Sequence, residues 1–389
     1  PMGENTARLA VTRLMLTNFR SYNSANISFG ARPVVLAGPN GAGKTNLLDA
    51  ISLLSPGRGL RGATLGEHTR RGPAMPGEAL WAVAASVSQD GEIFEIGTGL
   101  VLNVNGGERR QVRLNGAAAG NAGTLADIVQ MTWLTPAMDR LFIEGAGGRR
   151  RLLDRLVLGF DSAHARNTTH YEQAMRERTR LLANGPRDPA WLGGLEKEMA
   201  EAGVAMTLAR ADVVQQLNDV LAARGEAGAF PAAQLALTGD ADMLIHENGE
   251  AAVDSLREKF ERMRIRDAEA GRATFGPHRS DLAVRHTVKC APARECSTGE
   301  QKALLVSIVL AHARALSVSR GGRAPLLLLD EIAAHLDGER RAALFEEIIE
   351  LGAQAWMTGT DIEMFDALRG RADIFEVADS TPRKIAEAA

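Results

Sequence analysis

The sequence predicts an α/β fold in which an antiparallel β subdomain and a helical lobe accompany a parallel sheet. Two short, wholly apolar segments, 33–37 and 326–329, have the pattern of strands buried on both faces. Between them, apolar residues recur every three or four positions over 149–263, which indicates helices. Strands near both ends predict one lobe built from 9–135 and 266–389, with a helical lobe over 136–265 inserted in it.

The remaining patterns predict the other strands and helices of this fold. Residues 9–19 alternate roughly as a half-buried strand does, and a helix is expected after the loop that follows 33–37. Three further strand patterns, separated by Asp90-Gly91 and Gly106-Gly107, predict an antiparallel meander. These strands are 80–84, 93–96 and 111–114. Beyond the helical lobe we expect strands at 281–285 and 355–357 and helices at 300–316 and 340–349.

Composition and charge restrict the class of protein. With 45% hydrophobic, 24% charged and 4% aromatic residues, the chain is typical of a packed globular protein. A net charge of −3 argues against bulk electrostatic coating of nucleic acid, so any DNA binding requires a local basic patch. Cys290 and Cys296 lack the number and spacing of a disulfide framework or zinc site, which predicts reduced thiols in the cytoplasm. No uninterrupted apolar run approaches the ~18 residues of a membrane span, and no secretory pattern is present, so we expect no membrane association.

A glycine-rich loop follows the first apolar strand. It satisfies G-x-x-x-x-G-K-S/T between a predicted strand and a predicted helix, the context in which this pattern binds nucleotide phosphates. Glycines let the loop aim successive N–H groups at phosphate oxygens; the alternative is a glycine-rich turn without a ligand. We expect Lys44 to reach the β- and γ-phosphates and Thr45 to ligate Mg²⁺. The loop residues are Gly38, Pro39, Asn40, Gly41, Ala42, Gly43, Lys44 and Thr45.

Two carboxylates end the second apolar strand. Asp330 and Glu331 stand at the C-terminal end of a buried strand, where ligands of open α/β sheets collect. We expect Asp330 to hold the Mg²⁺ shell and Glu331 to orient and deprotonate the attacking water. A core strand that ends in a solvated acidic turn is the alternative. Asp330 follows Lys44 by 286 positions, so a large insertion separates the two halves of the site and disfavours a small GTPase.

A helix N-terminus about 30 residues before Asp330 carries a further pattern. Ser297 and Glu300 form a capping box, and Gly299 leaves backbone N–H groups accessible to an anion. The segment resembles the signature motif of ATP-binding cassette ATPases, S-x-G-E/Q, although a simple helix cap is the alternative. The resemblance implies that Ser297, Gly299, Glu300 and Gln301 of one copy cap the γ-phosphate of ATP held by another. ATP would then drive formation of a homodimer.

Other elements of that superfamily are partly present. His335-Leu336-Asp337 resembles the D-loop, in which Asp337 would cross the dimer interface; a surface helix cap is the alternative. The switch histidine of many transporters is replaced by 358–361, which read Thr-Gly-Thr-Asp, so we expect slow hydrolysis, with Thr358 or Thr360 as candidate γ-phosphate sensors. Gln130 is the nearest candidate for a Q-loop glutamine, although an ordinary surface glutamine is the favoured interpretation.

Four segments together resemble the RecF family, over roughly 9–375. The most distinctive is 274–282, which contains the family's G-P-H-R/K-x-D-L element. The others are 16–22 with 57–61; 136–145 with Arg149, Arg150 and Asp154; and the signature with its acidic strand. Three positions depart from the family pattern: Ala137 for an acidic residue, Gly147 for proline and Leu152 for an aromatic residue. The resemblance implies a P-loop NTPase of the ATP-binding cassette and SMC head type, with a short helical arm.

The resemblance also implies a function. It indicates a recombination mediator in DNA repair and replication-fork maintenance, which dimerises with ATP on gapped DNA or ss/dsDNA junctions without sequence preference. It would be a weak, DNA-stimulated ATPase that, with RecR and RecO, helps to load RecA. A transporter-type or other SMC-like cassette ATPase is an alternative, disfavoured by the missing switch histidine and the 276–282 element. A DNA clamp that uses ATP only to join its two copies is another.

Arginines supply the candidate DNA contacts. Clusters of this residue bind phosphates, and scarce aromatics disfavour stacking on unpaired bases. The candidates are Arg58, Arg61, Arg70 and Arg71, with 149–151 as a second cluster. A solvated or ion-paired surface is the alternative for each of them. Arg20 stands apart: in SMC-like heads an arginine on this early strand approaches ATP, and a structural ion pair is the equal alternative.

Overall fold

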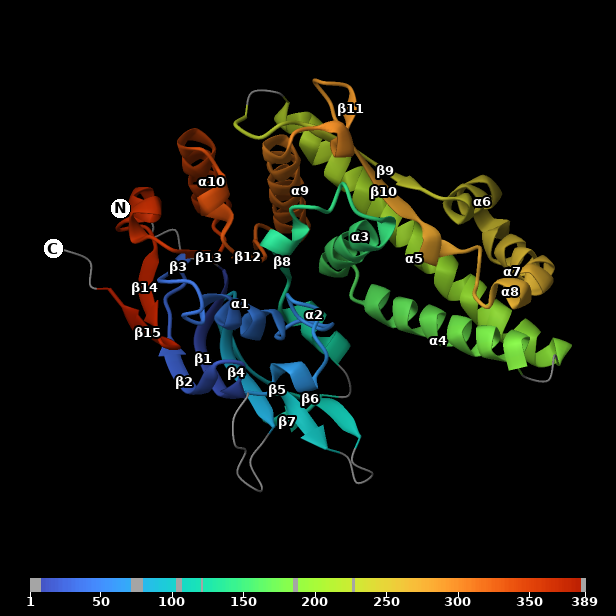
Figure 1. Ribbon diagram of the computed structural model, residues 1–389, viewed down its shortest axis with the longest axis horizontal. Helices are drawn as coiled ribbons and strands as arrows, with labels where there is room; N and C mark the ends of the chain where they lie inside the picture. Colours follow the sequence, from blue (N-terminus) through green and yellow to red (C-terminus); the bar gives the residue numbers. More distant parts are fainter. Residues whose placement is uncertain are drawn as a thin grey trace. The chain divides into compact units, whose positions relative to one another are not determined.

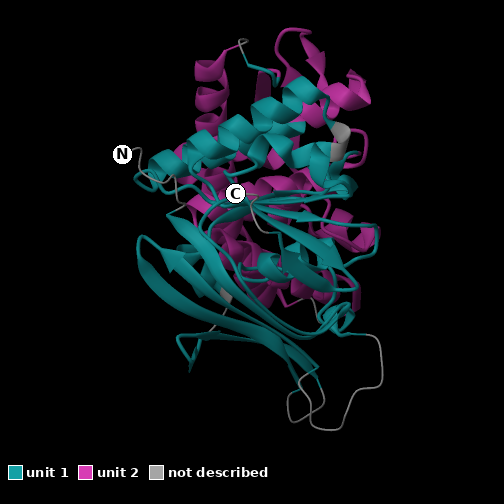
Figure 2. Ribbon diagram, turned by 90° about the vertical axis from the view of Figure 1, so that its left-hand side faces the viewer, with its two compact units in different colours: residues 1–139, 227–230, 305–389 teal, residues 140–226, 231–304 magenta. Residues whose placement is uncertain are grey.

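The computed structural model describes residues 8–70, 80–102, 107–119, 122–184, 188–225 and 228–385. The chain forms two compact units, coloured separately in Figure 2. Unit 1 comprises 1–139, 227–230 and 305–389, and unit 2 comprises 140–226 and 231–304. The second boundary differs from the one expected at residue 265, because 266–304 belongs to unit 2. In that segment β10 (Asp281–His286) pairs along its whole length with β9 (Ala233–Thr238), and this pairing joins it to the inserted lobe.

A six-stranded sheet in unit 1 has the order β15-β14-β3-β13-β12-β8. All neighbours are parallel except β14 and β15, and every residue of β3 and β12 is buried, as their apolar sequences require. Figure 1 shows β3, β13 and β12 side by side. The parallel sheet is thus confirmed. Its strands are β3 (Val34–Ala37), β8 (Met131–Leu134), β12 (Leu326–Leu329), β13 (Ala355–Gly359), β14 (Asp373–Ala378) and β15 (Thr381–Lys384).

The second sheet of unit 1 is antiparallel, with the order β2-β1-β4-β5-β6-β7. The expected meander is confirmed as β4, β5 and β6, and the half-buried first strand as β1. Sequence patterns did not indicate β2, which is mostly polar and is held by its pairing with β1. The strands are β1 (Leu9–Phe19), β2 (Tyr22–Ser28), β4 (Trp81–Gln89), β5 (Glu92–Leu102), β6 (Glu108–Leu114) and β7 (Ala117–Ala118). Apolar residues of both sheets form one continuous core.

Four α-helices and several short 3₁₀ segments accompany the two sheets in the described chain. The α-helices are α1 (Lys44–Ser52), α2 (Leu125–Ile128), α9 (Thr298–Ser319) and α10 (Gly338–Leu351). The boundary between the units falls within α9. Among described helices, α9 alone has the length and mean hydropathy, 1.4, to cross a membrane, but 78% of its apolar window is buried within the protein. This burial is that of a core helix.

Unit 2 is mainly helical. Its α-helices are α3 (Ala146–Phe160), α4 (Ala163–Asn184), α5 (Pro189–Arg224), α6 (Asp240–Asn248), α7 (Ala252–Arg262) and α8 (Arg264–Ala270). The long helices α4 and α5 pack along one another (Figure 1), and α7 packs on α5. The lobe is not wholly helical as expected, because β9 lies inside 136–265 and forms a small sheet with β10 and β11 (Ala291–Pro292).

Buried ion pairs join the helices of unit 2. Arg178, fully buried, donates to Glu196 at 3.0 Å and to Asp267 at 2.7 Å. Arg210 donates through two nitrogens to both carboxylate oxygens of Asp154, at 2.8 and 3.0 Å. Buried charges persist only when they are paired and hydrogen-bonded, so these contacts fix how the helices pack.

Candidate nucleotide-binding site

The glycine-rich loop connects β3 to α1, as its sequence predicts. Gly38 has φ of 153°, and a Cβ there would lie 2.2 Å from the carbonyl oxygen of Val377, so a side chain is excluded. Gly43, with φ of 105°, is the N-cap of α1, and no side chain caps this helix. The chain therefore turns sharply onto a helix N-terminus whose first N–H groups have no side-chain partner, the arrangement that favours phosphate.

Lys44 and Thr45 begin α1 and point to different partners. Lys44 as a whole residue is 4% exposed, and its Nζ donates to the carbonyl oxygens of Gly38 at 2.6 Å and Pro39 at 2.8 Å. Burial lowers the pKa of Lys44, and the charge of Glu331 opposes part of this effect. The Thr45 hydroxyl donates to Asp330 Oδ1 at 2.9 Å across 285 residues of sequence. The fold thus brings the two halves of the expected site together.

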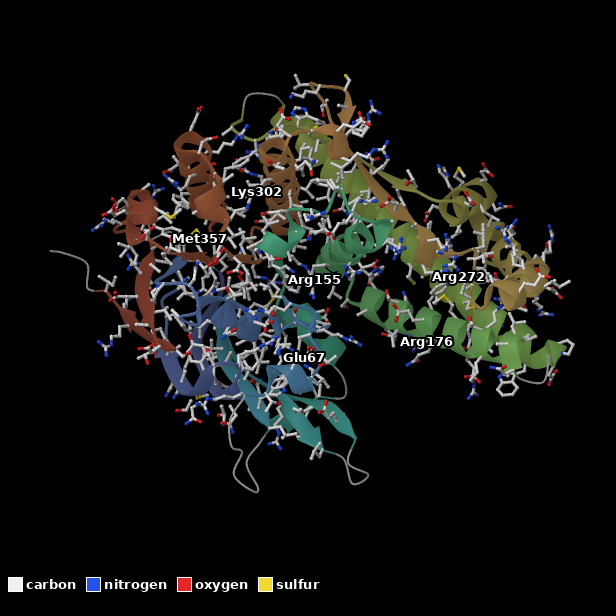
Figure 3. The ribbon with its side chains drawn as sticks, viewed as in Figure 1. Glu67, Arg155, Arg176, Arg272, Lys302 and Met357 are labelled. Carbon is white, nitrogen blue, oxygen red and sulfur yellow. The ribbon has the colours of Figure 1, made fainter. Side chains whose placement is uncertain are left out.

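The acidic pair directly follows β12, which lies beside β13. Leu329, the last residue of β12, pairs in parallel with Met357 of β13, so the next residue, Thr358, lies beside the carboxylates. Met357 is labelled in Figure 3. The fully buried Thr358 hydroxyl donates to Asp330 Oδ1 at 2.8 Å and accepts the backbone N–H of Glu331 at 2.8 Å. Burial raises the pKa of Asp330, and the hydrogen bonds from Thr358 and Thr45 offset part of that rise.

Glu331 has a left-handed backbone, with φ of 53°. This conformation is uncommon for a residue with a side chain and costs of order 1–3 kcal/mol. The hydrogen bond from its N–H to Thr358 helps to hold it. Thr358 therefore connects the Asp330 carboxylate to the backbone of Glu331. Thr360, by contrast, is exposed and donates only to its neighbour Asp361, at 3.0 Å.

Arg20 makes a structural ion pair. Its guanidinium contacts the fully buried Asp49 of α1 at 2.9 Å and donates to the carbonyl oxygen of Glu67 at 2.9 Å. Glu67 is labelled in Figure 3. Burial would raise the pKa of Asp49, but His68 and Arg20 lower it below its usual value. The structure shows the ion pair of Arg20 with Asp49, and the approach of Arg20 to ATP stays a prediction.

The signature segment forms the expected capping box. The backbone N–H and the hydroxyl of Ser297 both donate to Glu300 Oε2, each at 2.9 Å. Hydrogen bonds from Lys289 and Ser297 lower the pKa of Glu300 to about 2, so this carboxylate stays ionised and stabilises α9 above pH 4.5; the stabilisation is lost as pH falls towards 2. Gln301 is buried and donates to the carbonyl oxygen of Cys296 at 2.8 Å. Gly299 is exposed, with no atom within 4 Å of its Cβ position.

Several further candidates have local partners. Asp337 is the N-cap of α10 and accepts the N–H of Arg340 at 2.8 Å, which is the alternative reading of that residue. Gln130 is 3% exposed and donates to the carbonyl oxygen of Ala126 at 2.6 Å, so the surface interpretation of this glutamine is wrong. Its position between α2 and β8 buries it, and its polarity alone did not indicate this.

The basic candidates differ in environment. Arg58, Arg61 and Arg70 are exposed, and the charge of Arg61 offsets a small part of the rise that burial causes in the pKa of Asp330. Arg71 lies outside the described residues. Arg149 forms an ion pair with Asp281, at 2.7 Å. Exposure therefore keeps Arg58, Arg61 and Arg70 as the described candidates for DNA contact in this cluster.

Comparison with known proteins agrees with this architecture. The family model described as the RecF/RecN/SMC N terminal domain matches residues 10–381. A solved structure of the recombination mediator protein RecF-ATPrS in the RecFOR pathway superposes with a TM-score of 0.83 at 22% identity, covering 98% of this chain and all of that one. The Smc head domain of Pyrococcus furiosus gives 0.52 at 17% identity, covering 97% and 96%. The fold is that of an SMC-head-type ATP-binding cassette protein.

Sequence relatives define the family more narrowly. The DNA replication and repair protein RecF of Rhizobium etli strain CIAT 652 is 49% identical over 96% of this chain and 98% of its own length. RecF of Agrobacterium fabrum is 48% identical with the same coverage. The chain belongs to the RecF family of DNA replication and repair proteins, as 274–282 and the other segments indicated.

Proposed function

We propose that this chain is an ATP-controlled, DNA-binding recombination mediator. ATP joins two copies on gapped DNA or ss/dsDNA junctions, slow hydrolysis releases them, and the protein acts with RecR and RecO to load RecA. The observation that carries the proposal is the contact between Thr45 and Asp330, at 2.9 Å, which assembles loop and acidic strand into one site. RecF relatives of about half-identical sequence, and the solved RecF-ATP structure, support the same function.

The site has the groups that ATP requires. Backbone N–H groups of the loop and the N-terminus of α1 would bind the phosphates. Lys44 Nζ would exchange its carbonyl partners, Gly38 and Pro39, for phosphate oxygens. Mg²⁺ would be held by Thr45 and Asp330 and would neutralise charge on the phosphates. Within the described residues no cluster of three or more His, Cys, Asp or Glu side chains is present, so phosphate oxygens and water would complete the Mg²⁺ shell.

Hydrolysis depends on Glu331 and on how it is held. Glu331 would accept a proton from the attacking water, while Asp330 stays near the phosphate through the Mg²⁺ shell. Thr358 positions both residues by accepting the N–H of one and donating to the carboxylate of the other. The transporter switch histidine is absent from this sequence, which favours slow turnover.

The signature would act on a second copy. Within the capping box, the hydroxyl of Ser297 accepts the N–H of Glu300, and its carbonyl oxygen accepts the N–H of Gln301. The N–H groups of Thr298 and Gly299 have no acceptor among the described residues. Both residues are exposed at the N-terminus of a 22-residue helix, so they are available to the γ-phosphate of a partner copy. Asp337 would contribute to the same interface. Free Cys290 and Cys296 support a reducing, cytoplasmic location.

Sedimentation of the wild-type chain tests the proposal. With ATP the chain should change from monomer to dimer, and a gapped duplex should stimulate phosphate release by severalfold. Intact dimerisation without any hydrolysis would favour the clamp that uses ATP only to join its copies. A chain that stays monomeric with ATP and DNA would contradict the proposal.

Thr358→Val is expected to uncouple ATP binding from hydrolysis. The change keeps the shape of the side chain but removes both hydrogen bonds to the acidic pair, so turnover should fall about tenfold while ATP affinity changes by about twofold or less. Phosphate release and equilibrium ATP binding measure the two effects. Thr360→Val is the matched control, because the Thr360 hydroxyl donates to Asp361 and not to Asp330. A larger effect at Thr360 would make that residue the γ-phosphate sensor instead.

A further inference from the structure

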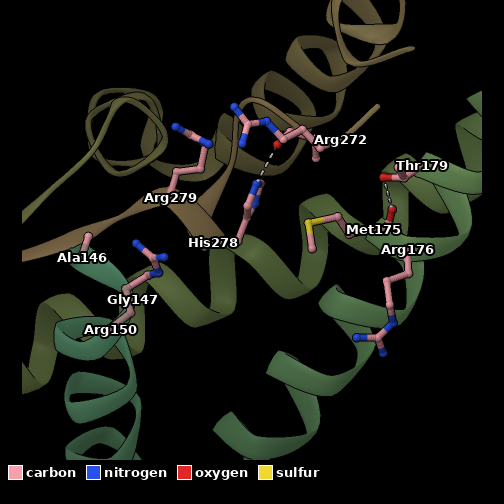
Figure 4. A pocket seen from close by; sticks show the side chains of 10 residues that line it. Ala146, Gly147, Arg150, Met175, Arg176, Thr179, Arg272, His278 and Arg279 are labelled. Atoms are coloured by element: carbon pink, nitrogen blue, oxygen red, sulfur yellow. Dashed lines mark hydrogen bonds between the residues drawn. The ribbon is translucent and has the colours of Figure 1, made fainter. Parts of the chain in front are cut away.

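A cavity of about 570 Å³ lies wholly within unit 2. Its walls come from the start of α3, one face of α4, and the segment between α8 and β10 (Figure 4). That segment contains Gly276, His278 and Arg279 of the 274–282 element, which has no part in the nucleotide site described above. The most distinctive motif of the chain therefore lines a separate cavity.

The cavity is strongly cationic. Four arginines are among its ten lining residues, and no carboxylate is; the arginines are Arg150, Arg176, Arg272 and Arg279. In Figure 4, Arg150, Arg272 and Arg279 gather on the side of His278, whereas Arg176 projects from α4 away from them. The side chains of Arg272 and Arg279 are exposed and make no hydrogen bond or ion pair with any described residue. Their charge is therefore available to a ligand.

Arg150 adds positive charge at greater depth. It is partly buried and donates to the carbonyl oxygen of Ser280 at 2.7 Å. Burial lowers the pKa of Arg150, and the neighbouring charges of Arg210 and Arg279 lower it further, although Asp281 and Asp154 oppose them. Asp281 and Asp154 already pair with Arg149 and Arg210. An anion at Arg150 would relieve the remaining repulsion.

The N-terminus of α3 opens onto the same space. Ala146 and Gly147, the first residues of this 15-residue helix, line the cavity, and the N-cap Gly145 offers no side-chain cap. No atom lies within 4 Å of a Cβ position at Gly145. The helix dipole and the first-turn N–H groups thus add to the field of the arginines.

The family motif holds the arginine-bearing segment in place. Gly276 has φ of 138°, and a Cβ there would lie 2.2 Å from the Tyr171 hydroxyl. Because this space is free, Tyr171 reaches His278 Nδ1 at 2.8 Å, while His278 Nε2 lies 3.1 Å from the Ala273 carbonyl oxygen. A carbonyl only accepts, so Nε2 carries the proton and Nδ1 accepts from Tyr171. His278 is therefore neutral and joins Tyr171 to the backbone of Ala273, and burial lowers its pKa, which favours the neutral form.

We propose that this cavity is a binding site for phosphate groups of nucleic acid or of a free polyphosphate, with Arg150, Arg272 and Arg279 as its principal ligands. Guanidinium groups match phosphate oxygens in charge and geometry. The volume lies within the range of about 300–1,000 Å³ typical of ligand pockets. Among the described residues, no aromatic ring other than His278 lines the cavity, so recognition is of phosphate rather than of a stacked base.

Paired charge-removal variants test the site. The cavity variant is Arg272→Gln with Arg279→Gln, and the control variant is Arg180→Gln with Arg262→Gln. Each removes two positive charges from exposed positions of unit 2, but Arg180 and Arg262 lie outside the cavity and pair with glutamates of their own helices. Circular dichroism and thermal unfolding should show both variants folded, because none of the four side chains is buried.

Two probes are used without ATP at low salt. The first is tripolyphosphate, titrated calorimetrically into proteins that also carry Lys44→Ala, which weakens phosphate binding at the glycine loop. The second is a short labelled duplex with 5′-phosphate or 5′-hydroxyl ends, followed by fluorescence anisotropy. The cavity variant should bind at least one probe about tenfold more weakly than wild type, and the control should stay within about twofold.

The pattern of loss identifies the source of the phosphate. A preference for 5′-phosphate ends that the cavity variant loses indicates a strand terminus. Equal loss for both duplexes indicates internal phosphodiesters, and loss with tripolyphosphate alone indicates a free ligand. The proposal is overturned if neither probe distinguishes the cavity variant from the control. If wild type binds no DNA while tripolyphosphate still distinguishes them, the proposed function fails and the cavity site stands.

Discussion

Glu331→Gln is expected to trap an ATP-bound dimer. Glutamine keeps the size of the side chain and its place after β12, but it cannot accept the proton of the attacking water. Loss of a general base lowers rates by about 10²–10⁴-fold, so phosphate release should become nearly undetectable. ATP binding should persist, because the loop, Lys44 and the Thr45–Asp330 contact are unchanged. Light scattering after size-exclusion chromatography with ATP measures the dimer directly.

Glu339→Gln is the control for this variant. Glu339 is an exposed residue in the first turn of α10, and the same loss of one charge there should leave both turnover and oligomeric state unchanged. A Glu331→Gln protein that remains monomeric with ATP would show that binding alone does not join two copies. Normal turnover in that protein would assign the base to another residue.

Ser297→Arg is expected to abolish ATP-dependent dimerisation while sparing ATP binding by the monomer. Ser297 is exposed at the start of α9, so an arginine there is tolerated by the fold but fills the space that a partner's phosphate would enter. The weakening of the dimer should be at least about 100-fold, since both the steric fit and the hydroxyl contact are lost. Sedimentation with ATP and equilibrium nucleotide binding separate the two effects.

Loss of the helix cap has to be distinguished from this steric effect. Ser297→Ala removes the same hydroxyl from the capping box and should cost about 0.5–2 kcal/mol of stability, without adding bulk. We therefore expect Ser297→Ala to dimerise with ATP, more weakly than wild type, and Ser297→Arg not to dimerise at all. Unchanged sedimentation of the arginine variant would contradict a role for the signature in a partner's site.

The candidate site was largely predictable because its motifs are contiguous. The glycine-rich loop, the acidic strand and the capping box each place their functional groups within a few residues, where the chemistry of the backbone and of a helix N-terminus dictates residue type. Four leucines before Asp330 likewise indicate a strand buried on both faces. Local patterns of this kind predict the structure correctly because they depend on the conformation of neighbouring residues.

Contacts between distant segments were not predictable in this way. The pairing register of β12 with β13 makes Thr358, rather than Thr360, the partner of Asp330. Arg20 pairs with Asp49 because α1 buries that carboxylate, although the sequence left two alternatives for this arginine equal. The segment 266–304 joins unit 2 through the pairing of β10 with β9.

By itself, then, the sequence determined the parallel sheet, the meander, the glycine-rich loop and the residues that we propose bind and cleave a nucleotide. Only the tertiary structure decided which side chains position those residues, and it gathered Arg150, Arg272 and Arg279 around one cavity from elements more than a hundred residues apart. The physical reason is range: backbone conformation and helix caps depend on neighbours in sequence, whereas strand register, burial and charge pairing depend on which distant surfaces pack together.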